Sequence, residues 1–207
     1  MAGRHKNSRK GPKGIGEPDA SKDRMVHDAA RGVKLESVRD LLSKEPSLKE
    51  AEEIRVAVQT ETDRGMALIS TALAETGLYY AIYRRLPNLG EQMENALFRE
   101  LGAPLATFSA RITMARCMAI IGPETEELLG QVRRIRNVFA HALRPIDFSN
   151  PTISNECANL HLPEPLRLIV KDKTARKKFE VACHWLYSSL FQDAMEQEGR
   201  TFMCLLP

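Results

Sequence analysis

The sequence contains few cysteines, and they are widely separated. None of the four belongs to a C-x-x-C pair, so their spacing predicts neither a zinc site nor a disulfide framework. We therefore expect reduced, mostly buried thiols, no metal ion and no cofactor. The cysteines are Cys117, Cys157, Cys183 and Cys204.

Long apolar runs are also absent from the sequence. No stretch approaches the roughly 18 uncharged apolar residues that a membrane helix needs, and the lysine-rich start lacks the apolar segment of a signal peptide. Strict alternation of apolar and polar residues is nearly absent, with residues 166–170 as the exception, which argues against a central sheet. We expect a cytoplasmic protein with no membrane partner.

Positive charge is concentrated at the start of the chain. Residues 1–34 contain nine Lys or Arg and four Asp or Glu, a net charge of +5, whereas all 207 residues together carry +3. The start is rich in Gly, Pro and Lys and offers little apolar surface to offset the entropy of ordering. We expect residues 1–34 to be a disordered basic tail and residues 35–207 to form a single helical domain. A second basic run, residues 171–178, is either a solvated face or a nucleic-acid contact.

From residue 36 onward, apolar residues recur at the helical spacings of three, four and seven. The longest run begins after a cap at Thr60 or Thr62 and ends at Pro87, and another begins at Pro123 and reaches about Leu143. The pattern predicts an all-α, multi-helix antiparallel bundle. Further helices are expected over residues 36–44, from Leu48, over 91–101, from Thr107 or Ser109 to Gly122, over 153–159 and over 174–195.

Residues 128–144 separate into an apolar and a polar face when they are projected onto a helix at about 100° per residue. Arg136 breaks this pattern, because it projects into the apolar sector, where an unpaired guanidinium is costly to bury. We expect it to reach the end of the bundle, to hold an anionic ligand such as phosphate, or to pair with a carboxylate. The candidate carboxylates are Asp63, Glu61 and Glu75.

Two polar residues accompany this arginine. Asn137 and His141 are four residues apart, so they face the same way and are placed to hydrogen-bond, which would fix the tautomer of the imidazole. The candidate residues for a ligand or a structural ion pair are Asp63, Arg64, Arg111 and Arg136.

Three segments of the sequence resemble, in order and spacing, motifs of the mannitol operon repressor family. They are Thr62-Asp-Arg-Gly65, Phe108-Ser-Ala-Arg-Ile112 and Ile135-Arg-Asn-Val-Phe-Ala-His141, with residues 148–157 after them. The resemblance covers roughly residues 55–165 and implies a bacterial regulator of transcription. We find no helix-turn-helix. Such a regulator is expected to be a homodimer that acts through a protein partner, or through weak nucleic-acid contact by the basic tail.

A shorter resemblance concerns Arg136-Asn137-Val-Phe-Ala-His141, which is similar to the R-N-x-x-x-H signature of the HEPN superfamily of helical bundles. Several members of that superfamily cleave RNA without a metal ion. The resemblance implies that His141 acts as general acid or base and that Arg136 stabilises phosphate charge, in a site shared across a dimer. The catalytic candidates are therefore Arg136, Asn137 and His141.

A third interpretation is a non-catalytic dimeric interaction module, in which the same residues only lock helices together. Because Arg136 projects toward the core, a regulator without enzymatic activity is favoured over a ribonuclease. The three interpretations make different demands on the structure: catalysis requires Arg136 and His141 to reach solvent together, whereas a purely structural role requires a carboxylate partner for Arg136.

Overall fold

The computed structural model of the protein describes residues 48–87, 89–171 and 173–196. Within these ranges every regular element is a helix, which confirms the predicted all-α class. None of the described helices is both long enough and apolar enough to cross a membrane. Three predicted features lie outside the described residues: the basic tail with its boundary at residue 34, the helical segment 36–44, and Cys204.

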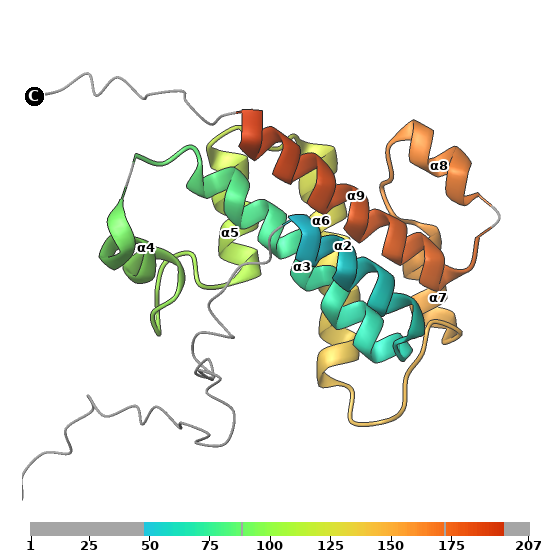
Figure 1. The fold of residues 1–207 in the computed structure, drawn as a ribbon. Coiled ribbons are helices and arrows are strands. Elements are labelled where there is room, and N and C mark those ends of the chain that lie inside the picture. Colours follow the sequence, from blue (N-terminus) through green and yellow to red (C-terminus); the bar gives the residue numbers. More distant parts are fainter. Residues whose placement is uncertain (1–47, 88, 172, 197–207) are drawn as a thin grey trace, which may run out of the picture. The chain divides into compact units, whose positions relative to one another are not determined.

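Two long neighbouring helices, α3 (Asp63–Tyr83) and α9 (Ala175–Glu196), form the middle of the fold (Figure 1). They run parallel, and Asp63 in the first turn of α3 pairs with Arg176 in the first turn of α9. This pair differs from the antiparallel packing that the sequence predicted. The reason is the long connection, residues 84–174, which returns the chain to the starting end of α3 before α9 begins.

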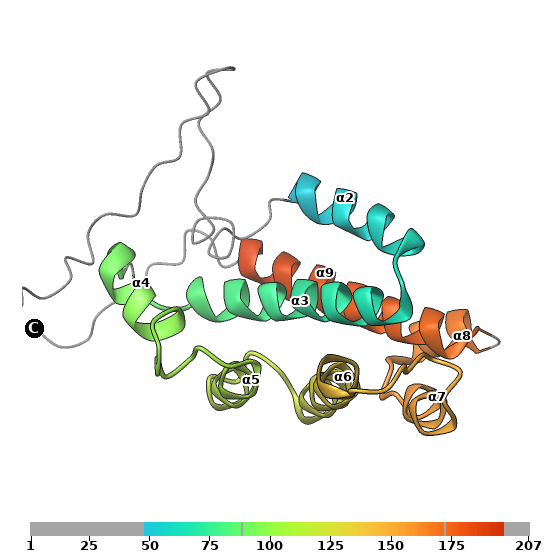
Figure 2. The same cartoon turned by 90° about the horizontal axis from the view of Figure 1, so that it is seen from below.

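The helices around this pair form a layer on each side of it (Figure 2). On one side lies α2, and on the other lie α5, α6 and α7, which cross the central pair at a steep angle. The short helices α4 and α8 follow α3 and precede α9, respectively. The bounds are α2 Leu48–Ala57, a 3-10 turn Val58–Thr60, α4 Gly90–Phe98, α5 Phe108–Cys117, α6 Pro123–His141, α7 Pro151–Ala158 and α8 Glu164–Val170.

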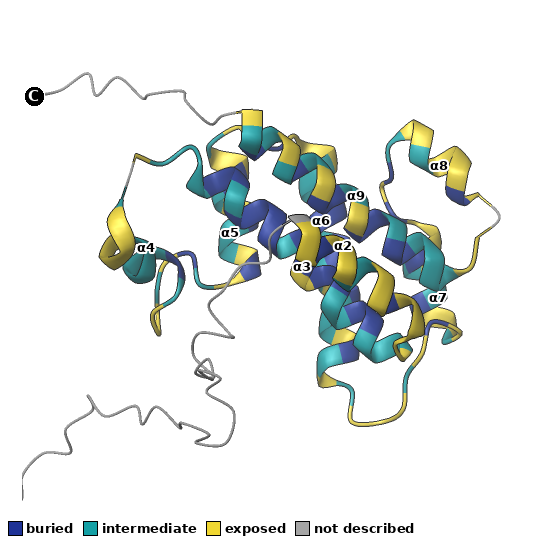
Figure 3. Cartoon of the chain, viewed as in Figure 1, coloured by how far each residue is buried: buried dark blue, intermediate teal, exposed yellow. Residues whose placement is uncertain are grey.

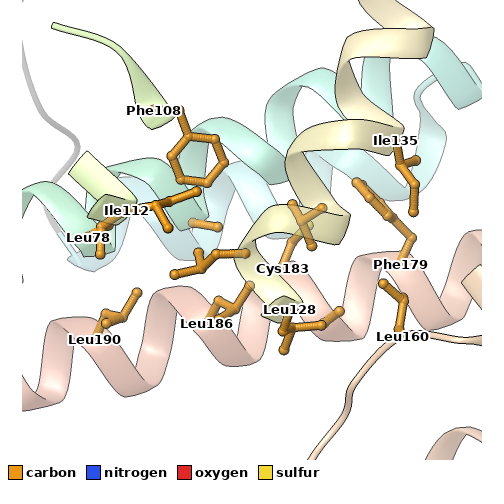
Figure 4. Close-up of a cluster of buried hydrophobic side chains, with 14 of the residues drawn as sticks. Leu78, Phe108, Ile112, Leu128, Ile135, Leu160, Phe179, Cys183, Leu186 and Leu190 are labelled. Atoms are coloured by element: carbon orange, nitrogen blue, oxygen red, sulfur yellow. The ribbon is translucent and has the colours of Figure 1, made fainter. Parts of the chain in front are cut away.

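The apolar core lies where the central pair meets the layer of α5 and α6. Buried residues lie on the facing sides of these helices, and exposed residues lie on the sides that point away from the core (Figure 3). Each helix can supply such a side because its buried positions recur at three and four residues. Figure 4 shows part of this core, including Leu78, Phe108, Ile112, Leu128, Ile135, Leu160, Phe179, Cys183, Leu186 and Leu190.

Capping residues set the starts of the helices that carry the candidate site. The hydroxyl oxygens of Thr62 and Thr107 accept hydrogen bonds from the backbone N–H groups three residues later, at 3.1 and 3.2 Å. Helices α3 and α5 therefore begin after these two residues, and not after the alternatives Thr60 and Ser109. Helix α6 begins with Pro123, as the sequence predicted.

Two details differ from the sequence prediction. Residues 166–170 were the one segment with an alternating apolar and polar pattern. They belong to helix α8, which has a proline in its first turn. Cys117 is exposed, whereas Cys157 and Cys183 are buried as expected. Burial raises the pKa of the Cys157 thiol to about 12 and also raises the pKa of Cys183, so neither is a ready nucleophile.

Candidate functional site

Charge is unevenly distributed along α6. Its first turns carry Glu124, Glu126 and Glu127. Residues 128–146 then contain no Asp or Glu, but they hold four arginines and His141. Acids near the start of a helix and bases near its end both complement the helix dipole. The second half of α6 therefore presents a basic surface that has no acid of its own.

The polar side chains of this half lie outside the face of α6 that packs into the core. Arg133, Arg136, Asn137 and His141 are three, one and four residues apart, so they share one side of the helix. We call these four residues the basic stripe. The first three are half-buried, and His141 is exposed. The buried residues of α6 are Leu128, Leu129, Gln131, Val132, Ile135 and Phe139.

Arg136 has no ion-pair partner among the described residues. Its Nη1 atom donates a hydrogen bond to Oδ1 of Asn137 at 3.2 Å. The predicted partners Asp63 and Glu75 pair with other arginines, and Glu61 is exposed. The predicted ion pair is therefore not formed. A half-buried arginine at the edge of an apolar face can lay its aliphatic stem against the core and keep its charge near water.

His141 is the last residue of α6. The predicted hydrogen bond between Asn137 and His141 is not formed, because the amide oxygen of Asn137 accepts from Arg136 instead. The imidazole of His141 makes no hydrogen bond to any residue that the structure describes. Its imidazole is therefore available to an external group, about one turn from the Arg136–Asn137 pair.

The loop after α6 is held by a residue of α3. Nη2 of Arg64 donates to the carbonyl oxygen of Ala142 at 2.7 Å and, more weakly, to that of Arg144 at 3.5 Å. Because Ala142 is the C-cap residue of α6, the guanidinium also meets the negative end of the helix dipole. Leu143 lies between the two carbonyl groups. Arg64 thus fixes the backbone next to the basic stripe.

The neighbouring residue, Asp63, holds the other end of the same loop. Its Oδ2 atom accepts a hydrogen bond from the backbone N–H of Phe148 at 2.8 Å, and its Oδ1 atom pairs with Arg176. Arg176 also donates to the carbonyl oxygen of Glu61 at 2.8 Å. Asp63 therefore joins α3, α9 and the loop, and this carboxylate is already occupied by the protein.

Arg111 is likewise used within the fold. Its Nε atom donates to the carbonyl oxygen of Leu105 at 2.8 Å, and it pairs with Glu75 at 3.4 Å. The guanidinium lies over the rings of Tyr79 and Phe98, at 5.6 and 5.7 Å from their centroids. This arginine therefore holds helices together. The candidate residues that remain for a ligand are those of the basic stripe.

A polar cluster that sequence reasoning missed lies between α2, α3 and α9. Glu180 is buried and accepts hydrogen bonds from Gln59 at 2.6 Å and from Lys177 at 2.9 Å. Together with His184 it lines a small, open crevice. Burial, followed by the charge of Arg55, lowers the pKa of His184. The available signal was the spacing of Glu180 and His184, which are four residues apart on the last helix and therefore lie near each other on its surface.

The chemistry of the basic stripe is that of an anion site. Guanidinium groups donate in a fork that fits phosphate oxygens. In the part of the chain that the structure describes, no three His, Cys, Asp or Glu side chains come together in a way that could hold a metal ion. The arginines of the stripe are therefore suited to bind an anion such as phosphate.

Comparison with protein-family models, with curated proteins and with solved structures finds no match to this chain. The resemblances seen in the sequence motifs therefore stay predictions.

Proposed function

We propose that this chain is a cytoplasmic bacterial regulator of transcription that binds nucleic-acid phosphates through the basic stripe of α6. The observation that carries the proposal is Arg136, which is half-buried and has no carboxylate partner among the described residues. A guanidinium that is partly removed from water and left unpaired favours an external anion. The resemblance to the mannitol operon repressor family supports the regulatory role.

The surroundings of Arg136 strengthen the attraction for phosphate. Residues 128–146 supply four arginines, His141 and no acid. Arg134 shares its charge with Glu127 at 3.0 Å, but both side chains are about half exposed, so the pair is weak. Phosphate contacts release counterions, so binding through this surface should fall steeply as salt rises.

Binding in the manner of a helix-turn-helix is not part of the proposal. Such a motif places the beginning of its second helix in the major groove. The beginning of α6 carries Glu124, Glu126 and Glu127, which would repel the phosphate backbone. In the proposal, the second half of α6 contacts the phosphates of the DNA and not the edges of its bases. Selectivity for an operon would then come from a protein partner or from the spacing of two sites in a homodimer.

The test is a salt titration of binding to a labelled DNA duplex of about 20 base pairs. Fluorescence anisotropy is measured between about 50 and 200 mM salt for the wild type and for Arg136→Gln. Arg167→Gln is the matched control, because Arg167 is an exposed arginine of α8. Arg136→Gln should weaken binding and reduce the slope of log K against log salt by about 1, and the control should leave both unchanged. A wild type that does not bind, or a variant with wild-type affinity, overturns the proposal.

The basic tail is tested separately, because residues 1–34 carry a net charge of +5 and could themselves bind phosphates. A variant without residues 1–34 is titrated in the same way. If binding survives the deletion with a reduced salt slope and still depends on Arg136, the stripe and the tail both contact phosphate. If binding is lost on deletion and Arg136→Gln has no effect, the contact belongs to the tail and not to α6.

A second candidate function is metal-independent cleavage of RNA at the same stripe. It is favoured by the exposure of His141 and by the unpaired Arg136 five residues earlier on the same side of α6. His141 would act as general base or acid, and Arg136 would stabilise phosphate charge. Labelled RNA is incubated with the protein in chelator. Cleavage that is lost in a folded His141→Ala variant identifies a nuclease, and intact RNA with both proteins removes this candidate. A dimer that is inert toward RNA and DNA would instead indicate a non-catalytic module, and sedimentation velocity detects that dimer.

A further inference from the structure

Leu143 lies two residues after the end of α6 and is fully exposed, at 104% of its reference area. Single exposed leucines are common on protein surfaces, so exposure alone assigns no function. Two further observations set Leu143 apart. The backbone on both sides of it is held in place, and the charges that flank it are positive.

Two adjacent residues of α3 hold the loop that carries Leu143. Arg64 donates to the carbonyl oxygens of both neighbours of Leu143, at 2.7 and 3.5 Å. Asp63 accepts from the backbone N–H five residues after Leu143, at 2.8 Å. A loop that is held at both ends has little conformational entropy left to lose on binding. The exposed side chain is therefore presented in a preorganised position.

The charge near Leu143 is of one sign. His141 and Arg144 flank it, and the second half of α6 before it contains no acid. The first acid after it is Asp147, whose Oδ1 atom accepts a hydrogen bond from the backbone N–H of Ser149 at 2.9 Å. An apolar side chain thus stands between cationic groups. This combination fits a polyanion that also has an apolar interior.

We propose that Leu143 is an apolar wedge that enters between two base pairs of a DNA duplex, while Arg144 and the basic stripe bind the flanking phosphates. Proteins that bend DNA through the minor groove insert side chains such as leucine between base steps, and the added contacts to bent DNA offset the cost of unstacking. The inference rests on the proposed function, because the wedge needs the phosphate contacts of the stripe.

Single-stranded nucleic acid is the other polyanion that these charges could attract. Proteins bind its bases chiefly by stacking them on aromatic rings. Among the described residues, the large hydrophobic side chains that are exposed include no aromatic ring. A protruding aliphatic side chain without an aromatic platform therefore favours the duplex.

The test uses a DNA duplex that contains 2-aminopurine, a base analogue whose fluorescence rises when it is unstacked. The wild type is compared with Leu143→Ala and with Leu101→Ala. Leu101 is the matched control, since it is equally exposed, at 107%, but follows α4. Leu143→Ala should lose most of the fluorescence rise and keep the salt slope, because the slope counts phosphate contacts. Leu101→Ala should behave as the wild type. Leu143→Met keeps a similar apolar volume and should retain the rise.

The outcomes separate the wedge from the proposed function. If the wild type binds the duplex without raising the fluorescence, or if Leu143→Ala raises it equally, the wedge is wrong and phosphate binding stands. If the wild type binds no duplex, both proposals fail. Tighter binding to a single strand than to the duplex would also overturn the wedge. Because Leu143 is fully exposed, its variants should fold normally, and circular dichroism verifies this.

Discussion

Asp63 pairs with Arg176 across 113 residues of sequence, and this ion pair ties together the first turns of two parallel helices. Arg176 also donates to the carbonyl oxygens of Glu61 and Val58, at 2.8 and 3.2 Å. Parallel helices bring two positive dipole ends side by side, so a carboxylate at this point interacts favourably with both. The pair therefore stabilises the end of the fold that supports the loop after α6.

Replacing Asp63 by Asn is expected to lower the free energy of unfolding by about 2 kcal/mol, because the half-buried Arg176 loses its counter-charge. Urea denaturation measures this change. The control is Glu53→Gln, which breaks an exposed pair with Lys49 at 3.8 Å and should change stability by less than about 0.5 kcal/mol. Equal effects of the two substitutions would show that the Asp63 pair is no stronger than a surface ion pair.

Gly77 lies where α3 meets the backbone of α9. A Cβ atom there would stand 3.0 Å from the carbonyl oxygen of Tyr187 and 3.3 Å from Cβ of Leu190. Backbone atoms cannot rotate away, so the helices would have to move apart. Gly77→Ala is expected to destabilise the protein by about 1–3 kcal/mol, even though alanine has the higher helix propensity. Urea denaturation gives the sign and the size of the change.

Gly130 provides the matched control within α6. A Cβ atom there would meet only the end of the Arg134 side chain, at an ordinary contact distance of 3.6 Å. Gly130→Ala should therefore stabilise the protein by about 0.5–1 kcal/mol through helix propensity. The two alanine substitutions thus have opposite expected signs. If Gly77→Ala were also stabilising, the close packing of α3 on α9 would be contradicted.

The helices could be predicted from the sequence because each carries local signals. Thr62 and Thr107 cap two of them, Pro123 begins another, and the apolar spacing marks the face that each one buries. The relative direction of α3 and α9 has no such signal. It depends on the path of the intervening helices, which bring the chain back to the same end, and no local pattern encodes that path.

The candidate site, like the fold, could be predicted from the sequence only in part. The spacing of Arg136, Asn137 and His141 was enough to place them on one side of one helix. The partner of Arg136 could not be predicted from the sequence. Tertiary contacts decide which carboxylate, if any, pairs with a given arginine. Asp63, for example, is occupied by an arginine of α9 that lies far away in the sequence.

Arg64→Ala is expected to loosen the loop after α6, because it removes the donor that the carbonyl groups of Ala142 and Arg144 share. Hydrogen exchange measured by mass spectrometry should become faster for residues 142–148, with a loss of stability of about 1 kcal/mol. Protection of the amides in the middle of α9 should fall only as far as this loss of global stability requires. Unchanged exchange in the loop would contradict the role of Arg64 as its brace.

Cys117 should be the one described cysteine that reacts quickly with a thiol reagent in the folded protein. It is exposed, whereas Cys157 and Cys183 are buried. The raised pKa of Cys157, about 12, also keeps its thiolate scarce at neutral pH. A Cys204→Ser background removes the thiol that lies outside the described residues. Ellman's reagent should then detect one fast thiol in buffer and two additional ones in urea, and a second fast thiol in buffer would contradict the burial.

His184 is expected to make the stability of the fold depend on pH. Burial and then Arg55 lower its pKa in the folded protein, and Glu52 and Glu180 oppose this without reversing it. Below the unfolded pKa of about 6.5, the unfolded chain therefore binds a proton more readily than the folded one. Stability should fall as the pH decreases from there toward the lowered folded pKa. Thermal unfolding between about pH 8 and pH 5 measures this dependence.

His184→Gln should remove this contribution, because Gln keeps a polar side chain but does not titrate. The matched control is His161→Gln, since His161 is exposed and only its backbone N–H is used, in a hydrogen bond to Gln131 at 2.9 Å. The control should keep the pH dependence of the wild type, while His184→Gln should show a flatter dependence of Tm on pH below about 6.5. If both variants follow the wild-type curve, the imidazole of His184 does not set the acid sensitivity of the fold.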